Sequence, residues 1–290
     1  AGAAPPRREG VHVVVPGDVA DRMFRIALGV GAEHVVQLPH SESWLVELLT
    51  DVGEGARQPA LTIGVIGGSG GAGATTFACA LGETATRSGA SLVVDLDPCG
   101  PGVDRVLGLE THDGIRWDAL QQTTGRLSAR SLREAVPARR GLGVLTWGPT
   151  RAEPVPVFAV REALSAARRG FDVVVVDLPR QVDPMVEEVV ARCDQMVVVT
   201  VPTLGGVAAA ARLVDRLGAR QAAHVVRGAG LDGAGVSRVT GLPVLATMRD
   251  QRGLDEAIGL GAGPVHSSRG VLARTAAEVL ALLRPARAAA

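Results

Sequence analysis

The sequence contains no lysine, so all 30 of its basic residues are arginine. Thirty acidic residues balance them, and the formal net charge is +0. This balance excludes a generally basic surface of the kind that binds nucleic acid without sequence preference. A local patch stays open, because residues 126–140 are rich in arginine. A solvated basic face is one interpretation of that stretch, and contact with DNA or an acidic partner is the other.

Cysteine and long apolar runs are also scarce. The three cysteines, Cys79, Cys99 and Cys193, are too few and too scattered for a disulfide scaffold or a zinc pattern. The six histidines are dispersed and show no metal-ligand spacing. No run approaches the ~20 apolar residues of a membrane span, and residues 1–10 lack the apolar core of a signal peptide. We therefore expect a cytoplasmic protein, recruited to a membrane or a cell pole only by partners.

Residues 61–76, LTIGVIGGSGGAGATT, are the most informative stretch. A short apolar run precedes five glycines in seven residues, and Thr75 and Thr76 open a helical segment. This is the pattern of a strand, a phosphate-binding loop and a helix. Glycines let the backbone N–H groups line a concave nest, and the helix adds its positive N-terminal end. An ordinary glycine-rich turn is the alternative.

The loop departs from the P-loop pattern G-x-x-x-x-G-K-[ST] at one position. Gly68 and Gly73 fall in register, and Thr75 takes the place of the hydroxyl that binds magnesium. Ala74 stands where the lysine belongs. The sequence therefore predicts a phosphate site without its usual cation.

Carboxylates end two apolar runs. Residues 91–98 predict a buried strand that stops at Asp95 and Asp97, and residues 171–179 predict a second strand that stops at Asp177. Ligands of open α/β sheets collect at such strand ends. We expect Asp95 and Asp177, with Thr75, to hold Mg²⁺ through water, and Asp97 to orient an attacking water. A polar strand exit is the alternative for Asp95 and Asp97.

The alternation of apolar runs and helical stripes predicts the fold class. From residue 61 onward, strands and helices follow each other, which predicts a mostly parallel, doubly wound α/β sheet. Residues 11–49 predict a separate β-α-β-α segment. We expect that segment to occupy 1–52, a linker 53–60, and a nucleotide-binding domain 61–290.

These motifs resemble those of the ParA/MinD ATPases. The loop at 67–76, the strand end at 94–98 and the run at 171–179 look like the deviant Walker A, switch I and Walker B of that superfamily. The segment in front resembles the second half of a receiver domain, with Gly31-Ala32 before its last strand and Leu38-Pro39 where a Lys-Pro pair belongs. An extension of the neighbouring sheet is the alternative. A pseudo-receiver before the ATPase motifs is similar to the CpaE/TadZ branch.

The resemblance implies a set of site residues, and it implies that two lysines and one asparagine of the family are replaced in this chain. The family's two loop lysines correspond to Ser69 and Ala74, and the asparagine of an adenine-contacting Asn-Arg pair corresponds to Val226, beside Arg227. A hydrogen bond to a charged group contributes ~1.5–3 kcal/mol, so two lost cations weaken phosphate binding about a hundredfold to ten-thousandfold. The implied nucleotide-binding residues are Gly68, Ser69, Gly70, Gly71, Ala72, Gly73, Ala74, Thr75, Thr76 and Arg227.

Three functions follow from the resemblance. The favoured one is a dimerising localisation factor that positions Tad-type pilus and secretion machinery or the division septum, and that binds ATP or ADP with Mg²⁺ weakly or not at all. The second is a working ATPase switch in which an arginine replaces the lysines. The third is a ParA-like protein that binds DNA through the arginines of 126–140. The favoured function leaves hydrolysis weak or absent.

Overall fold

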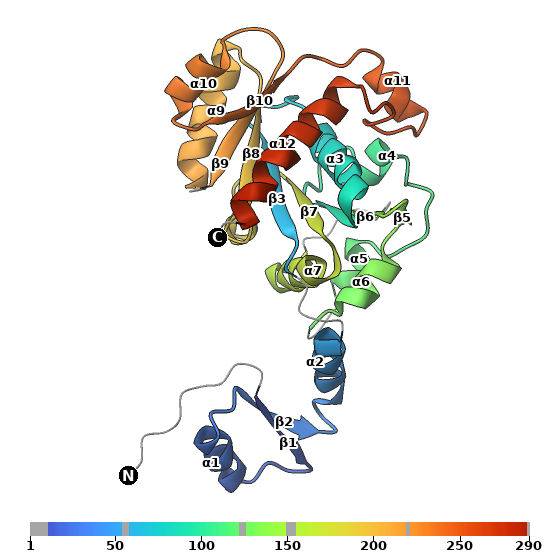
Figure 1. Ribbon diagram of the computed structural model, residues 1–290, viewed down its shortest axis with the longest axis vertical. Helices are drawn as coiled ribbons and strands as arrows, with labels where there is room; N and C mark the ends of the chain where they lie inside the picture. The colour runs from blue at the N-terminus through green and yellow to red at the C-terminus, as the bar shows by residue number, and fades with distance from the viewer. Residues whose placement is uncertain (1–10, 54–57, 122–125, 149–154, 219–220, 289–290) are drawn as a thin grey trace. The chain divides into compact units, whose positions relative to one another are not determined.

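The structure is a computed structural model in which the chain forms two compact units, Ala1–Arg57 and Gln58–Ala290 (Figure 1). The residues that it describes are 11–53, 58–121, 126–148, 155–218 and 221–288. Within these ranges, no helix combines the length and the apolar character that a membrane crossing needs.

The first unit has the expected β-α-β-α order. Its elements are β1 (His12–Pro16), α1 (Asp21–Gly29), β2 (His34–Leu38) and α2 (Glu42–Gly53). The strands pair in parallel, and Val15, Ala27 and Val36 form the buried centre. Helix α1 begins after Ala20, which gives it no side-chain cap. Because α2 continues to Gly53, the linker boundaries at 53–60 remain a proposal.

Parallel pairing brings two histidines of this unit together. His12 and His34 are Cα partners at the beginnings of β1 and β2. The histidines are dispersed along the sequence, yet the fold brings these two side by side. Sequence spacing hides such a contact, because strand register rather than chain distance decides which residues face each other.

The second unit contains an eight-stranded sheet in the order β10-β9-β8-β3-β7-β4-β6-β5. The strands are β3 (Leu61–Gly67), β4 (Ser91–Asp95), β5 (Ala138–Arg139), β6 (Leu142–Leu145), β7 (Val173–Leu178), β8 (Gln195–Thr200), β9 (Ala222–Arg227) and β10 (Val244–Met248). All neighbours pair in parallel except β5 and β6. The predicted class, a mostly parallel α/β sheet, is confirmed.

Helices cover the sheet on both faces (Figure 1). They are α3 (Ala74–Ala85), the 3-10 turn η1 (Thr86–Ser88), α4 (Val103–Leu107), α5 (Trp117–Leu120), α6 (Ala129–Ala135), α7 (Val157–Gly170), α8 (Pro184–Val190), α9 (Leu204–Leu217), α10 (Gly233–Thr240), α11 (Leu254–Gly259) and α12 (Val271–Ala288). Strand β7 shows why both faces are apolar: Val173 and Val175 pack with α3 and α12, whereas Val174 and Val176 pack with α7 and α8.

Strand β3 lies inside the sheet between β7 and β8, and all seven of its residues are buried. In the register of β4 and β7, Asp95 stands opposite Asp177. Because β3, β4 and β7 run in parallel, their carboxyl ends share one edge of the sheet. The predicted loop and the predicted carboxylates therefore meet at that edge.

Candidate nucleotide-binding site

The glycine-rich segment forms a tight loop between β3 and α3. Its first amide, Gly68 N, donates to Val199 O of β8 at 2.9 Å, and Ala72 N donates to Ser69 O at 3.3 Å. Helix α3 begins at Ala74, one residue before the expected Thr75, and Phe77 N donates to Gly73 O at 3.0 Å. The loop thus leads directly into a helix N-terminus, which favours an anion.

Two of the glycines are required by their surroundings. Gly73 has φ +89°, in the left-handed region that side chains other than glycine rarely adopt. A Cβ on Gly73 would lie 2.6 Å from Nη1 of Arg227. A Cβ on Gly68 would lie 2.8 Å from the Cβ of Ala210 on α9. The left-handed backbone explains Gly73, and close packing explains Gly68, whether or not a phosphate binds.

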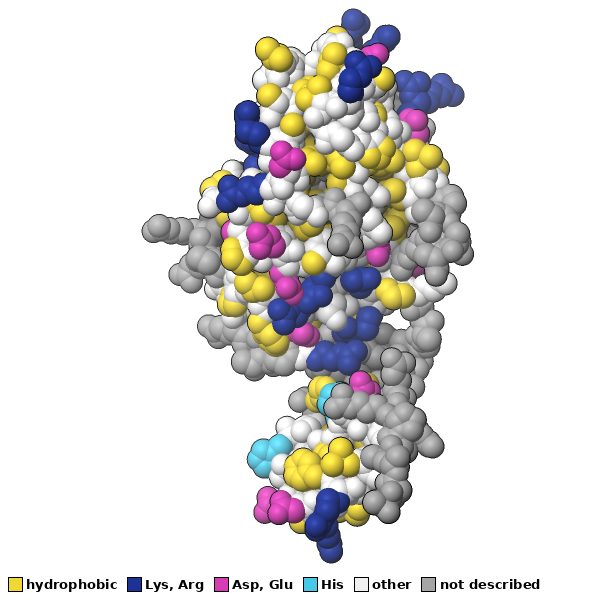
Figure 2. All heavy atoms as spheres, turned by 90° about the vertical axis from the view of Figure 1, so that its left-hand side faces the viewer, with side chains coloured by type: hydrophobic (Ala, Val, Ile, Leu, Met, Phe, Trp, Pro, Cys, Tyr) yellow, Lys and Arg dark blue, Asp and Glu magenta, His cyan; other side chains and the backbone are white. Residues whose placement is uncertain are grey.

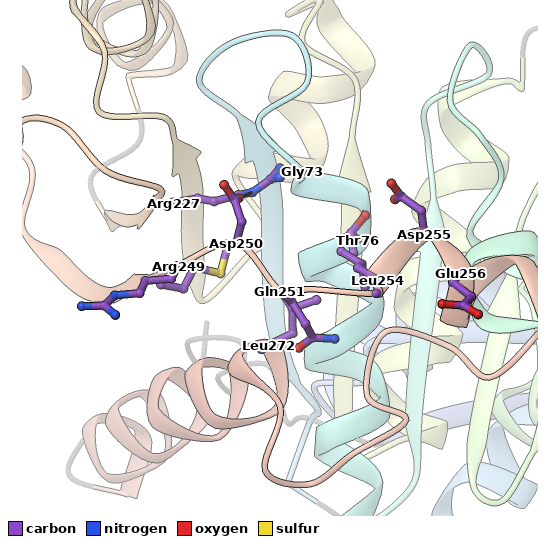
Figure 3. A pocket seen from close by; sticks show the side chains of 12 residues that line it. Gly73, Thr76, Arg227, Arg249, Asp250, Gln251, Leu254, Asp255, Glu256 and Leu272 are labelled. Atoms are coloured by element: carbon purple, nitrogen blue, oxygen red, sulfur yellow. Dashed lines mark hydrogen bonds and ion pairs between the residues drawn. The ribbon is translucent and has the colours of Figure 1, made fainter.

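Arg227 holds the outside of the loop. Its Nη1 donates to the carbonyl oxygens of Gly71 at 3.4 Å and Ala72 at 3.2 Å, and its Nε donates to Asp250 Oδ1 at 2.8 Å. Figure 3 shows the side chain reaching from the end of β9 toward Gly73. Arg227 therefore lies at the loop as the resemblance implies, and its contacts there are to backbone carbonyls.

A pocket of about 310 Å³ opens beside Arg227 (Figure 3). That volume is at the lower end of the range for small-molecule sites, ~300–1,000 Å³. Apolar and acidic side chains both line it, and among its lining residues only Gly73, Thr76 and Arg227 belong to the sequence motifs. Its lining is Gly73, Thr76, Arg227, Met248, Arg249, Asp250, Gln251, Gly253, Leu254, Asp255, Glu256 and Leu272.

Asp177 is a buried carboxylate with an unsatisfied oxygen. Its Oδ2 is inaccessible to solvent and has no hydrogen-bond partner among the described residues. Burial and then the charge of Asp95 raise the pKa of Asp177 to about 8, although a side-chain hydrogen bond with Thr75 lowers it. Such an oxygen needs a proton or a cation. Thr75 and Asp177 therefore lie in contact, and their role in holding a divalent ion stays a prediction.

Asp95 has a different environment from Asp177. Its Oδ2 accepts hydrogen bonds from Thr146 Oγ1 at 2.8 Å and Val103 N at 3.3 Å, and its Oδ1 accepts from Asp97 N at 3.1 Å. Burial raises the pKa of Asp95 to about 6, and these hydrogen bonds oppose the rise. The side chain therefore organises the turn after β4, and a role as a magnesium ligand stays a prediction.

Asp97 lies in that same turn and is partly exposed. Its Oδ1 accepts a hydrogen bond from Cys99 N at 3.0 Å, which closes an Asx turn. The backbone carbonyl of Asp95 accepts a hydrogen bond from Trp117 Nε1 at 2.7 Å. The fully buried indole of Trp117 therefore fixes the end of β4, two residues before Asp97. Asp97 is thus the more accessible carboxylate of the pair, and its role toward water stays a prediction.

Arg180 is a site residue that the sequence motifs did not single out. It lies two residues after the end of β7, is exposed, and its Nε donates to Gly67 O at 3.2 Å. A Cβ on Gly70 would lie 3.9 Å from Arg180 Nη1. Its guanidinium therefore stands beside the phosphate loop. Its position three residues after Asp177 was the available signal.

The arginines of 126–140 make contacts within the protein. Arg130 pairs with Glu134 at 2.8 Å, Arg133 Nη1 donates to Gly170 O at 3.5 Å, and Arg139 Nη2 donates to Leu107 O at 2.6 Å. On the face shown in Figure 2, arginines occur in separate places with acidic side chains among them. These contacts favour the solvated-face interpretation over contact with DNA.

Comparison with known proteins identifies the family. The Rv3660c protein of Mycobacterium tuberculosis is 38% identical over 286 residues, which cover 96% of this chain and 80% of that protein. A family model described as the Rv3660c-like, CheY-like N-terminal domain matches residues 1–60. The chain belongs to the Rv3660c-like family. The CheY-like match confirms the expected receiver-like segment at the start of this Rv3660c-like chain.

Solved structures give the fold of the second unit in this Rv3660c-like protein. A ParA family ATPase from Chlorobium tepidum matches with a TM-score of 0.67 and 16% identity, covering 78% of this chain and 100% of that one. The septum site-determining protein MinD of Pyrococcus horikoshii, solved with Mg-ADP, matches with a TM-score of 0.63 and 16% identity, covering 76% and 94%. The ParA/MinD fold is therefore confirmed, and the CpaE/TadZ branch stays a proposal.

Proposed function

We propose that this chain is a localisation factor on a ParA/MinD-type fold, with a degenerate phosphate loop that binds Mg-ATP or Mg-ADP weakly or not at all. One observation carries the proposal. The loop, the start of α3 and the orphaned Oδ2 of Asp177 are all retained, whereas Ser69 and Ala74 stand at the two lysine positions. A nest without its cations retains shape and loses phosphate affinity.

The biological role follows from the resemblance to the CpaE/TadZ branch. We propose that the chain acts as a homodimer that positions Tad-type pilus and secretion machinery or the division septum through protein partners. A receiver-like unit without the signalling lysine, with Leu38-Pro39 in that place, supports docking rather than phosphorelay. Recruitment to a membrane or pole would then come from those partners.

The residues at the strand ends fit Mg²⁺. Thr75 and Asp177 would hold it, since the Asp177 oxygen lacks a partner among the described residues, and Asp95 would act from the adjacent strand. The ion would neutralise phosphate charge when bound. The loop amides would orient the phosphates, and the pocket at Arg227 would take the nucleoside. That a MinD with this fold was solved with Mg-ADP supports this choice of ligand.

Calorimetric titration with Mg-ATP and Mg-ADP tests the proposal, together with a phosphate-release assay on the same protein. We expect submillimolar or weaker binding and no turnover above the background. Turnover that disappears in Asp97→Ala would contradict the scaffold function and establish the ATPase switch. Micromolar binding without turnover would refute the weak-binding part alone.

A working ATPase is the second candidate, and the position of Arg180 favours it. Its guanidinium beside Gly67 and Gly70 could supply a cation that the loop itself lacks. Arginine also offers a planar fork that matches phosphate geometry. In this candidate Arg180 stabilises the phosphates, Asp177 and Asp95 organise the metal, and Asp97 orients water.

Replacing Arg180 with alanine tests whether it contacts nucleotide. If it does, the affinity for Mg-ATP falls about tenfold to a hundredfold, because a hydrogen bond to a charged group is worth ~1.5–3 kcal/mol. Calorimetry measures the change. Arg130→Ala is the matched control, since Arg130 lies on α6 in an exposed pair with Glu134. Equal affinities in both variants would remove Arg180 from the site.

A further inference from the structure

Three side chains with metal-binding atoms gather in the first unit. His12 opens β1, His34 opens β2, and Glu33 directly precedes His34. One nitrogen of each imidazole and one carboxylate oxygen all lie within 4.8 Å of one another. Parallel pairing of His12 with His34 creates this arrangement, and no motif in the sequence predicts it.

The separations are close to those of a bound ion. In a tetrahedral zinc site, bond lengths of about 2.0–2.2 Å put neighbouring ligand atoms roughly 3.3 Å apart. The three atoms lie within 4.8 Å of one another, so side-chain rotation has to close a gap of at most about 1.5 Å to reach that spacing. Glu33 and His34 are exposed, so an ion has access from solvent.

The Nδ1 atom of His12 gives an independent reason to place a ligand here. It is inaccessible to solvent and has no hydrogen-bond partner within the described part of the chain. Buried polar atoms nearly always have a partner, so an orphaned nitrogen needs an explanation. A metal ion bound at Nδ1 would take its lone pair and supply the missing partner.

Trp44 packs against both histidines of the cluster. Its ring centroid lies 5.4 Å from those of both His12 and His34, and it meets His12 edge to face at 87°. Aromatic packing accounts for this spacing, although it gives His12 Nδ1 no partner. The indole packs against both histidine rings, and the apolar surroundings of a metal site control its access to solvent and its dielectric.

The cluster is independent of the nucleotide site. It lies at the amino ends of β1 and β2 in the first unit, whereas the residues of the candidate nucleotide site all belong to the second unit. We propose that His12, Glu33 and His34 bind a divalent transition-metal ion, with Zn²⁺ the best fit to two imidazoles and a carboxylate. The ion would tie the beginnings of the two strands together and leave a fourth position open.

Titration of the full chain with Co²⁺ alone tests the proposal after treatment with a chelator. We expect one equivalent of Co²⁺ to produce a visible absorption band of a four-coordinate nitrogen-ligated ion, and Zn²⁺ to displace it. Co²⁺ should also quench the fluorescence of Trp44, and Trp44→Phe should remove that quenching. The Asp177→Asn background keeps the other candidate cation site out of the measurement.

Three variants and one control decide the outcome. His12→Gln and His34→Gln should each abolish the band, and Glu33→Gln should weaken Co²⁺ binding. His40→Gln is the control, because His40 is an exposed histidine of the same unit outside the trio. Circular dichroism verifies that each variant folds. A band that survives in both histidine variants, or its absence in the parent chain, would overturn the site.

Discussion

Replacing Ser69 and Ala74 with lysine should raise the affinity for Mg-ATP about a hundredfold to ten-thousandfold. Each restored cation contributes ~1.5–3 kcal/mol to a charged phosphate, and 1.4 kcal/mol is tenfold in binding. Both positions lie on an accessible loop or its junction with α3, so lysine there avoids the fully buried core. Calorimetry on the double variant measures the gain.

The two lysines should act differently. In the ParA/MinD family that these motifs resemble, the second lysine grips phosphate within its own subunit, whereas the first crosses to the partner. Ala74→Lys alone should therefore raise the affinity for Mg-ATP about tenfold to a hundredfold, at any protein concentration. The additional effect of Ser69→Lys should grow with protein concentration, because it needs a dimer.

A control separates this effect from added charge. Ala281→Lys adds the same charge at an exposed position on α12 and should leave the affinity unchanged. If the double variant binds no better than this control, the loop does not have a phosphate-binding conformation. That result would refute nucleotide binding and leave the localisation function untouched.

Without nucleotide and metal, the second unit should lose stability as the pH rises from 6.5 to 8. Burial, followed by the charge of Asp95, raises the pKa of Asp177 from 3.8 to about 8. Between those values the folded state holds a proton that the unfolded state releases. The stabilisation is complete below the unfolded pKa and disappears as the pH passes the folded pKa.

The free energy of unfolding should fall by about 1.4 kcal/mol per pH unit, and each kcal/mol corresponds to roughly 2–4 °C in Tm. At the lower end of this window Asp95, with a pKa of about 6, adds slightly to the slope, whereas His224, whose pKa is lowered in the fold, opposes it because the unfolded chain still holds part of that proton. Thermal unfolding followed by circular dichroism at several pH values measures the slope. Added Mg²⁺ should restore stability more at pH 8 than at pH 6.5.

Asp177→Asn should flatten this profile, because an amide does not titrate. Asp215→Asn, an exposed acid on α9, should keep the parent slope. Equal slopes in the parent chain and in Asp177→Asn would show that Asp177 ionises normally in the fold. The Asp177 side chain would then no longer support a cation site.

Local signals in the sequence predicted most of the fold. The apolar run of β7 and the glycines after β3 specify their own conformation, and the α/β class follows from their alternation. The two-residue strand β5 was missed, because its antiparallel pairing with β6 depends on a turn at Arg140 with φ 52°. Short elements of this kind have too little periodicity to be recognised.

The candidate site was predicted only where its residues belong to a sequence motif. Thr75 and Asp177 stand in motifs, and the shared edge of parallel strands brings them together. Arg180 and Asp250 have no motif, and their places depend on where loops from different strands turn over the nest. The trio at His12 depends on strand register, which spacing along the chain does not reveal.

Because β3 is buried, the stability of this fold does not depend on the chemistry of the loop that follows the strand. With ordered hydrogen bonds to β7 and β8 on both sides, its amide protons should exchange with deuterium only when the whole unit unfolds. Ser69 and Ala74 lie outside that protected strand. Substitutions at the lysine positions can therefore remove catalysis without loosening the sheet, and a lineage can keep the architecture for assembly after turnover has gone.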